Sequence, residues 1–347
     1  MIRVQPLVLL SVLLLTACSP RPPVYQEQLL TFGTLVDVTL WNVDEARGQQ
    51  AVATLARDFD YMHDAWHAWH RGPLGRVNQL LPTGEWFSCP PSIVPLIQRS
   101  SELSQASGGL FNPAIGQLIK LWGFASDDPP KGPPPAPEAI RALVAQNPQM
   151  SDLQLEGIQL RSRNPAVRLD FGAFAKGYAV DRAIEQLREL GIKNAIVNAG
   201  GDLRAIGRHG ERPWRVGIRH PRQPGMLAAV DIEGDESVFT SGDYERYFDY
   251  DGKRYQHIID PRSGYPAEGL SSVTVFARQA DVADAAATAI TVAGPDVADW
   301  LPVARALGVT GVMLVDTAGR VQMTPSLRGR IYFDVEPKPE VRFSEPL

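Results

Sequence analysis

Cysteine is nearly absent from this sequence, which has only Cys18 and Cys89 among its 347 residues. The residues around Cys18 predict a separate role for it, so Cys89 is left without a partner for an internal disulfide. A domain without disulfides must be stabilised by burial of its core, and roughly 320 residues are enough for that. We interpret Cys89 as an ordinary thiol.

A strong charge of either sign is also missing. The formal net charge is −5, and no run of Lys and Arg with interleaved aromatic residues occurs, which excludes the usual signature of nucleic-acid binding. The phosphate-binding pattern GxxxxGK[ST] is absent as well. With ordinary apolar and charged fractions, the sequence indicates a globular protein of one large or two modest domains.

The N-terminal apolar run, Leu7–Leu15, is too short to cross a bilayer. It follows Arg3, which is typical of a signal peptide. The small residues before Cys18 in "LTAC" resemble the lipobox of bacterial lipoproteins, so we expect residues 1–18 to be a lipoprotein signal and Cys18 to carry the lipid. An ordinary signal peptide with an incidental cysteine is the alternative. The Pro-rich residues 19–30 predict a tether.

Residues 31–335 predict one mixed domain, and residues 336–347 a C-terminal tail. Alternation of apolar and polar residues predicts a first strand within residues 31–41, and helices are expected over Glu45–Trp66 and Pro91–Ala106. Residues 76–89, between the two helices, favour loop and turn.

The Pro-rich segment 125–137 is the strongest linker, because its prolines forbid helix and central strand. We interpret it as a surface excursion inside one fold, with a domain border as the alternative. Beyond it, helices are predicted over Ala175–Leu190 and Asp281–Ala293, and Asp251-Gly252 predicts a two-residue hairpin. Strands joined by tight turns, with helices between groups, indicate an α+β fold with largely antiparallel sheets flanked by helices.

Three oxygen-bearing side chains share one face of the second of these helices. Asp281, Asp284 and Thr288 are spaced i, i+3, i+7, and such a hard oxygen set suits Mg²⁺. Alternatively, Asp281 is an N-cap and Asp284 a first-turn acid that complements the helix dipole. That alternative leaves Thr288 unexplained.

A strand end at Leu169-Asp170 leads through Gly172 into a helix with Lys176 in its first turn. A glycine-containing turn before a helix N-terminus is a natural anion site, and the lysine adds a positive charge. A plain strand-to-helix connection with an exposed lysine is the alternative.

Three histidines, His63, His67 and His70, lie at i, i+4, i+7 among tryptophans. On one helical face they would ligate zinc or copper. Covering an aromatic ligand, or lying half-exposed, are the alternatives.

The order of the motifs carries more information than any one of them. "FGT", "RVN", "GLFNPAIGQLIKLWGF", "LDFGAFAKGYAVD", "NAGGDLRAIG", "TSGDYERYF", "YQHIIDPRSGYP" and "DVADAAATAITVAG" occur in this order. Together they resemble the ApbE family of FAD:protein FMN transferases, over nearly the whole length from Thr31 to Met323.

The resemblance implies an Mg²⁺-dependent enzyme that cleaves FAD, attaches FMN through a phosphoester to a Thr or Ser of a target protein, and releases AMP. It implies a compact α+β fold with FAD in a cleft between its two halves. The expected targets are subunits of membrane-bound redox complexes. The expected place is the periplasmic face of a bacterial membrane, with the inner membrane favoured and the outer as the alternative.

The resemblance also implies roles for individual residues. Asp281, Asp284 and Thr288 match the metal-binding helix, and Ala173 matches a position that binds the metal through its backbone carbonyl. His257 matches a histidine proposed to handle the proton in transfer. The expected FAD contacts are Phe32, Trp69, Leu110, Phe111, Asn112, Asp170 and Lys176.

Two of these positions depart from the family pattern: Phe32 stands where Met is commoner, and Asn112 where Asp is usual. The alternative function is a non-catalytic periplasmic lipoprotein that binds flavin or a metal.

Overall fold

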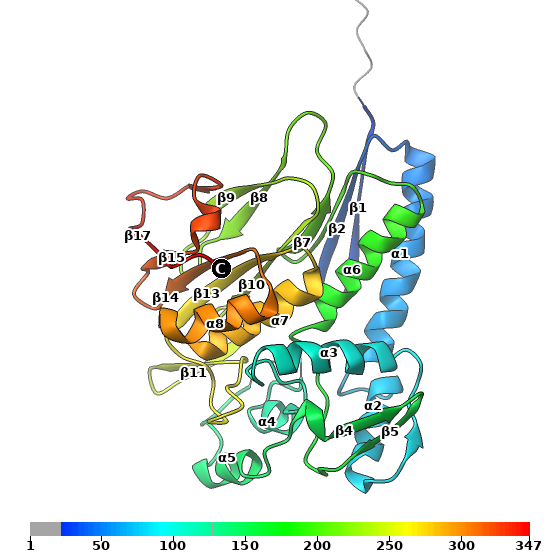
Figure 1. Ribbon diagram of the computed structural model, residues 1–347, viewed down its shortest axis with the longest axis vertical. Helices are drawn as coiled ribbons and strands as arrows, with labels where there is room; N and C mark the ends of the chain where they lie inside the picture. The colour runs from blue at the N-terminus through cyan, green and yellow to red at the C-terminus, as the bar shows by residue number, and fades with distance from the viewer. Residues whose placement is uncertain (1–21, 127, 129) are drawn as a thin grey trace, which may run out of the picture.

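The computed structural model describes residues 22–347 except 127 and 129. Its centre is a sheet of nine strands in the order β1-β2-β6-β7-β10-β13-β14-β15-β17 (Figure 1). Every neighbouring pair is antiparallel except β15 and β17. The strands are β1 Val24–Thr31, β2 Thr34–Trp41, β6 Ala195–Ala199, β7 Asp202–Ile206, β10 Glu236–Gly242, β13 Leu270–Ala277, β14 Gly311–Asp316, β15 Val321–Met323 and β17 Val341–Phe343.

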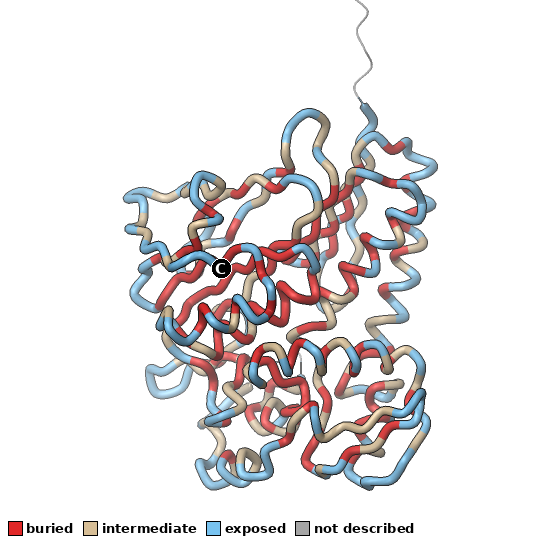
Figure 2. Tube along the Cα trace, viewed as in Figure 1, coloured by how far each residue is buried: buried red, intermediate tan, exposed pale blue. Residues whose placement is uncertain are grey.

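Three helices pack against one face of this sheet or its edge: α1 Glu45–Trp66, α6 Ala175–Glu189 and α7 Ala280–Ala293. A fourth helix, α8 Val297–Leu307, packs on α7. The most deeply buried of these helices is α7, in which only Thr288 and Ala293 are half-buried and every other residue is buried. Its small alanines let it pack closely against β10 and β13, with α6 and α8 as neighbouring helices, and the tube in Figure 2 is red along most of it. The helix that carries the predicted metal residues is therefore part of the core.

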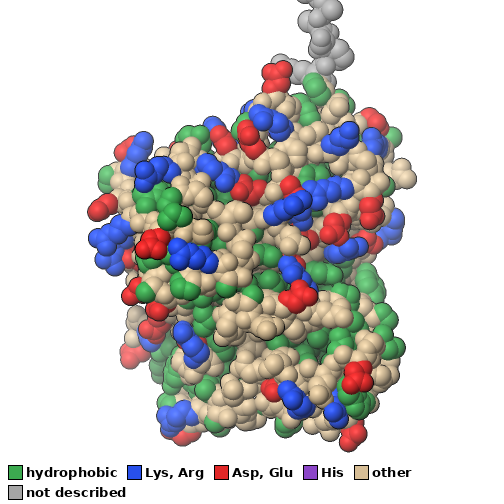
Figure 3. All heavy atoms as spheres, in the orientation of Figure 1, with side chains coloured by type: hydrophobic (Ala, Val, Ile, Leu, Met, Phe, Trp, Pro, Cys, Tyr) green, Lys and Arg blue, Asp and Glu red, His purple; other side chains and the backbone are tan. Residues whose placement is uncertain are grey.

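The other face of the large sheet packs on a three-stranded sheet of β8 Trp214–Arg219, β9 Met226–Ile232 and β16 Ile331–Phe333. A second apolar cluster fills the space between the two sheets, with Trp214, Val230, Phe276 and Met313 among its buried members. The two sheets pack face to face because each has apolar side chains on the side that faces the other, and packing removes these side chains from water. Lys and Arg are interspersed with Asp and Glu over the visible surface (Figure 3).

The second half of the molecule lies below the large sheet in Figure 1. Its helices are α2 Pro73–Leu80, α3 Val94–Ala106, α4 Gly116–Leu121 and α5 Pro137–Val144, and its small sheet contains β3 Phe87–Ser88, β4 Leu153–Glu156 and β5 Gln159–Ser162. Short 3-10 turns lie at Leu81–Thr83, Met150–Asp152 and, in the upper half, Pro325–Leu327. A separate hairpin is made by β11 Tyr247–Tyr250 and β12 Lys253–Gln256.

The structure confirms the predicted α+β class with largely antiparallel sheets flanked by helices. It also confirms the helix Glu45–Trp66 and the hairpin at Asp251-Gly252. Among the described residues, no helix is both long and apolar enough to cross a membrane. Cys18 and the predicted signal 1–18 lie outside the described residues.

Three predicted boundaries are wrong. Residues 24–30, expected in the tether, form strand β1, because they pair along their whole length with β2. The tail 336–347 contributes β17, which pairs with β15. Residues 76–89 were expected as loop, but they contain most of α2 and all of β3, because Leu74, Val77 and Leu81 share a buried helical face.

Candidate active site

Helices α6 and α7 cross so closely that each one binds the start of the other. The backbone N–H of Gly177 in α6 donates to Asp284 Oδ2 of α7, over 2.9 Å. A Cβ on Gly177 would lie 2.4 Å from the carbonyl oxygen of Ala280, so only glycine permits this crossing. One oxygen of Asp284 is thereby fixed, and the other accepts no hydrogen bond from the described residues.

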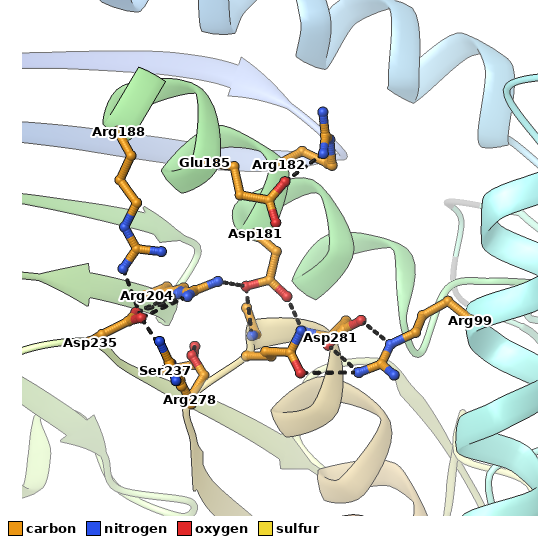
Figure 4. Close-up of polar contacts among 12 residues, drawn as sticks. Arg99, Asp181, Arg182, Glu185, Arg188, Arg204, Asp235, Ser237, Arg278 and Asp281 are labelled. Carbon is orange, nitrogen blue, oxygen red and sulfur yellow. Dashed lines mark hydrogen bonds and ion pairs between the residues drawn. The ribbon is translucent and has the colours of Figure 1, made fainter. Parts of the chain in front are cut away.

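The predicted metal face is divided in the structure. Asp284 and Thr288 lie one turn apart on α7, and Thr288 is half-buried. Asp281 has a different partner: its carboxylate accepts from Arg99 Nε at 2.6 Å and from Arg99 Nη2 at 3.3 Å. Arg99, from α3, thus binds both oxygens of Asp281 (Figure 4), whereas Asp284 has its own partner on α6.

Lys176 lies in the first turn of α6 and forms an ion pair with the buried Asp202 at the start of β7. Burial alone would lower the pKa of Lys176, but the charges of Asp202, Asp284 and Glu245 outweigh burial and raise it. Lys176 is therefore a permanent positive charge among three carboxyl groups. In the same cluster, burial is the main cause that raises the pKa of Asp284 and of Glu245 to about 7 each.

His257 follows β12 and is held twice by Arg246. Its backbone N–H donates to the Arg246 carbonyl at 3.0 Å, and its Nδ1 lies 3.1 Å from the same oxygen. A carbonyl oxygen only accepts, so Nδ1 carries the proton and Nε2 keeps the lone pair. Burial, with the nearby charges of Arg246 and Lys176, lowers the pKa of His257 to about 4.

A second polar group gathers around Asp170. Trp69 Nε1 donates to Asp170 Oδ2 at 3.0 Å, and the Gly172 N–H donates to Oδ1 at 2.7 Å. The Arg168 guanidinium lies 4.6 Å from the centre of the Trp69 ring, and its buried Nε has no hydrogen-bond partner. Burial raises the pKa of Asp170, against these hydrogen bonds and the charges of Arg246 and His67. Trp69 and Asp170 are thus brought together as one wall.

Phe32 lies at the β1–β2 turn with a φ of 53°, and its ring packs edge-on against Phe59 and His63. The three predicted histidines do not share a helical face, because α1 ends at Trp66 and His67 has extended backbone. The His67 and His70 rings stack with centres 3.6 Å apart. Within the described part of the chain, no group of three or more His, Cys, Asp or Glu side chains could hold a metal ion. The zinc or copper site is therefore not formed.

The segment 110–112 lies at the end of α3 and is mostly buried. Phe111 packs against Phe174, and Asn112 spans a loop, donating to the Pro148 carbonyl and accepting from the Ala114 N–H. Asn112 can make both bonds because an amide has a donor and an acceptor, whereas a carboxylate could only accept. Leu110 is the half-buried member.

Sequence reasoning missed Glu245 and Arg246 as site residues, although "GDYERYF" was among the motifs. Arg246 holds His257 and also donates to the carbonyls of Phe124 and Ser126, beside the Pro-rich excursion. A groove of about 630 Å³ lies there, lined by Phe124, Pro130, Lys131, Gly132 and residues 245–249. No sequence pattern links the hairpin residues 245–249 to the Pro-rich segment, because the two are far apart in the sequence and meet only in the fold.

Comparison with known proteins decides the family. Residues 32–310 match the model of the ApbE family. The chain belongs to the ApbE family. A protein of Rhodobacter capsulatus named FAD:protein FMN transferase is 43% identical over 319 residues, which cover 90% of this chain and 59% of the relative. A Klebsiella pneumoniae protein of the same name is 31% identical over 324 residues, covering 90% of this chain and 92% of the relative.

Solved structures of ApbE proteins have the same fold. The ApbE protein of Thermotoga maritima superposes with a TM-score of 0.80 at 28% identity, covering 89% of this chain and 99% of that one. The apo form of the Pseudomonas stutzeri flavinyl transferase ApbE has a TM-score of 0.77 at 29% identity, with 89% and 96% covered. The similarity thus extends over both halves of the described molecule.

Proposed function

We propose that this chain is an FAD:protein FMN transferase, which cleaves FAD, attaches FMN through a phosphoester to a Thr or Ser of a target protein, and releases AMP. The names of full-length relatives support this activity. The observation that carries it in this chain is the convergence of Asp284, Lys176 and His257, from α7, α6 and the segment after β12, on one electrostatic cluster.

The residues on α7 fit Mg²⁺. Asp284, Thr288 and the Ala173 carbonyl would supply hard oxygen donors, and the remaining positions would keep water, as Mg²⁺ usually does. The N–H of Gly177 fixes Asp284 Oδ2, so Oδ1 is the oxygen that would bind the metal. When bound, the metal neutralises charge on the pyrophosphate and polarises its phosphorus. Asp281 is left out of this set, because Arg99 occupies its carboxylate.

His257 is the proposed base. The acceptor hydroxyl oxygen forms a bond to the phosphorus of the FMN half, its proton passes to Nε2 of His257, and the phosphorus–oxygen bond to AMP breaks. A low pKa keeps this imidazole neutral and able to accept in the free enzyme. Burial is the main cause of this low pKa, and the charges of Arg246 and Lys176 add to it. The negative pyrophosphate would counteract these two charges and so raise the pKa of the base when the substrate is bound. Lys176 supplies a fixed positive charge for the phosphate oxygens.

We assign the FAD contacts to the wall made by Trp69 and Asp170, with Phe32 and Leu110 as apolar neighbours. The half-buried rings of Trp69 and Phe32 suit the stacking of a flat ligand. Phe111 and Asn112 act mainly from behind this wall, since Phe111 is buried and Asn112 holds a loop. FAD would lie in the cleft between the two halves.

We further propose that Cys18 carries a lipid and that the domain works at the periplasmic face of a bacterial membrane. The inner membrane is favoured, because the proposed targets are subunits of membrane redox complexes; the outer membrane is the alternative. The "LTAC" sequence before Cys18 supports the anchor.

The function is tested by incubating the protein with FAD, Mg²⁺ and a Thr- or Ser-containing acceptor peptide, and measuring AMP by chromatography. The proposal expects AMP to form in repeated turnover and only with Mg²⁺. Binding of FAD without AMP release would instead favour the alternative of a non-catalytic flavin- or metal-binding lipoprotein.

A further inference from the structure

Asp181 is a buried carboxylate outside the group of residues that would touch FAD or metal. It lies on α6, one turn beyond Gly177, and its side chain points at the first turn of α7 (Figure 4). Its Oδ1 accepts from the Ala280 N–H at 2.8 Å and its Oδ2 from the Asp281 N–H at 3.0 Å. These are the first two backbone N–H groups of α7, which have no partner inside the helix.

The capping of α7 therefore comes from another helix. Gln279, its own N-cap residue, makes no side-chain capping bond. Conversely, α6 has no cap from Phe174, and the N–H of Gly177 in its first turn is bound by Asp284. The two helices cap each other: Asp181 holds the start of α7, and Asp284 holds the start of α6. A shift at one of these contacts moves the other, because both join the same pair of rigid helices.

Arg204 keeps Asp181 paired in this buried place. Its side chain is 5% exposed and contacts Asp181 on one side and Asp235 on the other. Asp235 also pairs with Arg188 and Arg278 near the surface. A buried carboxylate without such a partner would carry a large desolvation cost. Arg204 lies on β7, so the pair also ties the α6–α7 crossing to the large sheet.

We propose that Asp181 and Arg204 are a positioning pair, which sets the place of Asp284 on α7 and so determines how tightly the site binds a divalent cation. This rests on the proposed function, in that Asp284 is taken as the metal ligand. Outer residues that orient a metal ligand typically change metal affinity by about 10- to 100-fold when they are replaced. Neither member of the pair belongs to the proposed set of metal ligands, because Asp181 is bound to Arg204 and to the backbone of α7.

The test is a titration of the full-length, FAD-free protein with Mn²⁺, in which free Mn²⁺ is followed by electron paramagnetic resonance. Asp181 uses a different oxygen for each of the two N–H groups of α7. In Asp181→Asn an NH₂ group replaces one of these oxygens, and it cannot accept the N–H group that it faces. We expect the Kd for Mn²⁺ to rise by about 10-fold or more. Unchanged Mn²⁺ binding in a folded Asp181→Asn protein would overturn the proposal.

Asp316 offers a matched control. It is also buried, its Oδ1 accepts the backbone N–H groups of Ala318 and Arg320, and its Oδ2 accepts from the Arg320 side chain, but it lies at the end of β14. Asp316→Asn should lower the melting temperature without changing the Kd for Mn²⁺. If it weakens Mn²⁺ binding as much as Asp181→Asn does, the effect is general destabilisation and the positioning role is refuted.

If Asp181→Asn does not fold, the double variant Asp181→Asn, Arg204→Met decides, because it removes both buried charges together and such replacements are often tolerated. Weakened Mn²⁺ binding in the folded double variant supports the proposal, and wild-type binding overturns it. Asp284→Ala tests the proposed metal site independently of the positioning pair. If Asp284→Ala binds Mn²⁺ normally, Asp284 is not a metal ligand and the proposed metal site itself is wrong.

Discussion

His257 differs most from what its residue type suggests, because the fold holds its imidazole neutral. Folding lowers its pKa from the ordinary value of about 6.5 to about 4. Between these values the unfolded chain binds the proton more readily, so this group reduces stability as the pH falls through that window. We expect nitrogen NMR of the FAD-free protein to show a neutral imidazole, protonated at Nδ1, down to a pH of about 5.

His257→Gln identifies the resonance in that titration. A midpoint near 6.5 would contradict the lowering of the pKa by burial and by the charges of Arg246 and Lys176. A spectrum with the proton on Nε2 would contradict the hydrogen bond from Nδ1 to the Arg246 carbonyl.

The two acids of α7 should behave differently. Asp284→Ala removes the proposed metal ligand and should abolish Mg²⁺-dependent AMP release. Asp281→Ala removes the ion pair with Arg99 and should cost about 1–3 kcal/mol of folding stability, with the Mg²⁺ requirement unchanged. The measurement is the Mg²⁺ dependence of AMP release together with denaturant unfolding. A raised Mg²⁺ requirement in Asp281→Ala would restore Asp281 to the metal site.

The sequence could suggest residue types for the site but not their partners. The i, i+3, i+7 spacing correctly placed Asp284 and Thr288 on one helix. It could not show that Arg99, which lies 182 residues earlier on α3, binds the Asp281 carboxylate. The histidine pattern failed for a local reason: it assumed that α1 continues past Trp66, whereas the chain becomes extended at His67.

At the scale of elements, the α6–α7 crossing should be sensitive to a single methyl group. Gly177→Ala gains about 1 kcal/mol of helix propensity but places a Cβ against the backbone of Ala280, which cannot rotate away. Overpacking of this kind costs about 1–3 kcal/mol. We expect a net loss of stability together with weaker Mn²⁺ binding, because α7 must move away from α6.

Gly48→Ala is the matched control for this prediction. Gly48 is also in a helix, α1, and its added Cβ would lie 2.2 Å from the Tyr25 ring, far from α7 in the fold. It should reduce stability with no effect on Mn²⁺ affinity. Equal losses of Mn²⁺ affinity in both variants would show that close packing at Gly177 has no special bearing on the site.

The elements that sequence patterns predicted well are those with a long amphipathic or apolar period, such as α1 and α6. Short elements defined by partners were missed. Strand β1 carries no strong alternation of its own and forms by pairing with β2. Strand β17 has three residues and depends on β15, across a segment that looks like a tail.

At the scale of the whole molecule, the fold class followed from the order of strands, turns and helices, whereas the proposed attachment to a membrane rests on the sequence of residues 1–18. We expect Cys18→Ser to release the protein from the membrane fraction of a bacterial host, with the AMP-forming activity per molecule retained. The measurement is fractionation followed by assay. Persistent membrane association of Cys18→Ser would exclude the lipid anchor and favour an ordinary signal peptide or a different attachment.

The central claim is that the α6–α7 crossing and His257 form one site for transfer of FMN to a hydroxyl group. Its most direct measurement is the intact mass of a Thr-containing acceptor peptide after incubation with FAD, Mg²⁺ and enzyme. The account predicts a covalent FMN adduct with the wild type, a rate lower by about 10²- to 10⁴-fold with His257→Ala, and no adduct with Asp284→Ala. Formation of the adduct at the wild-type rate by both variants would contradict it.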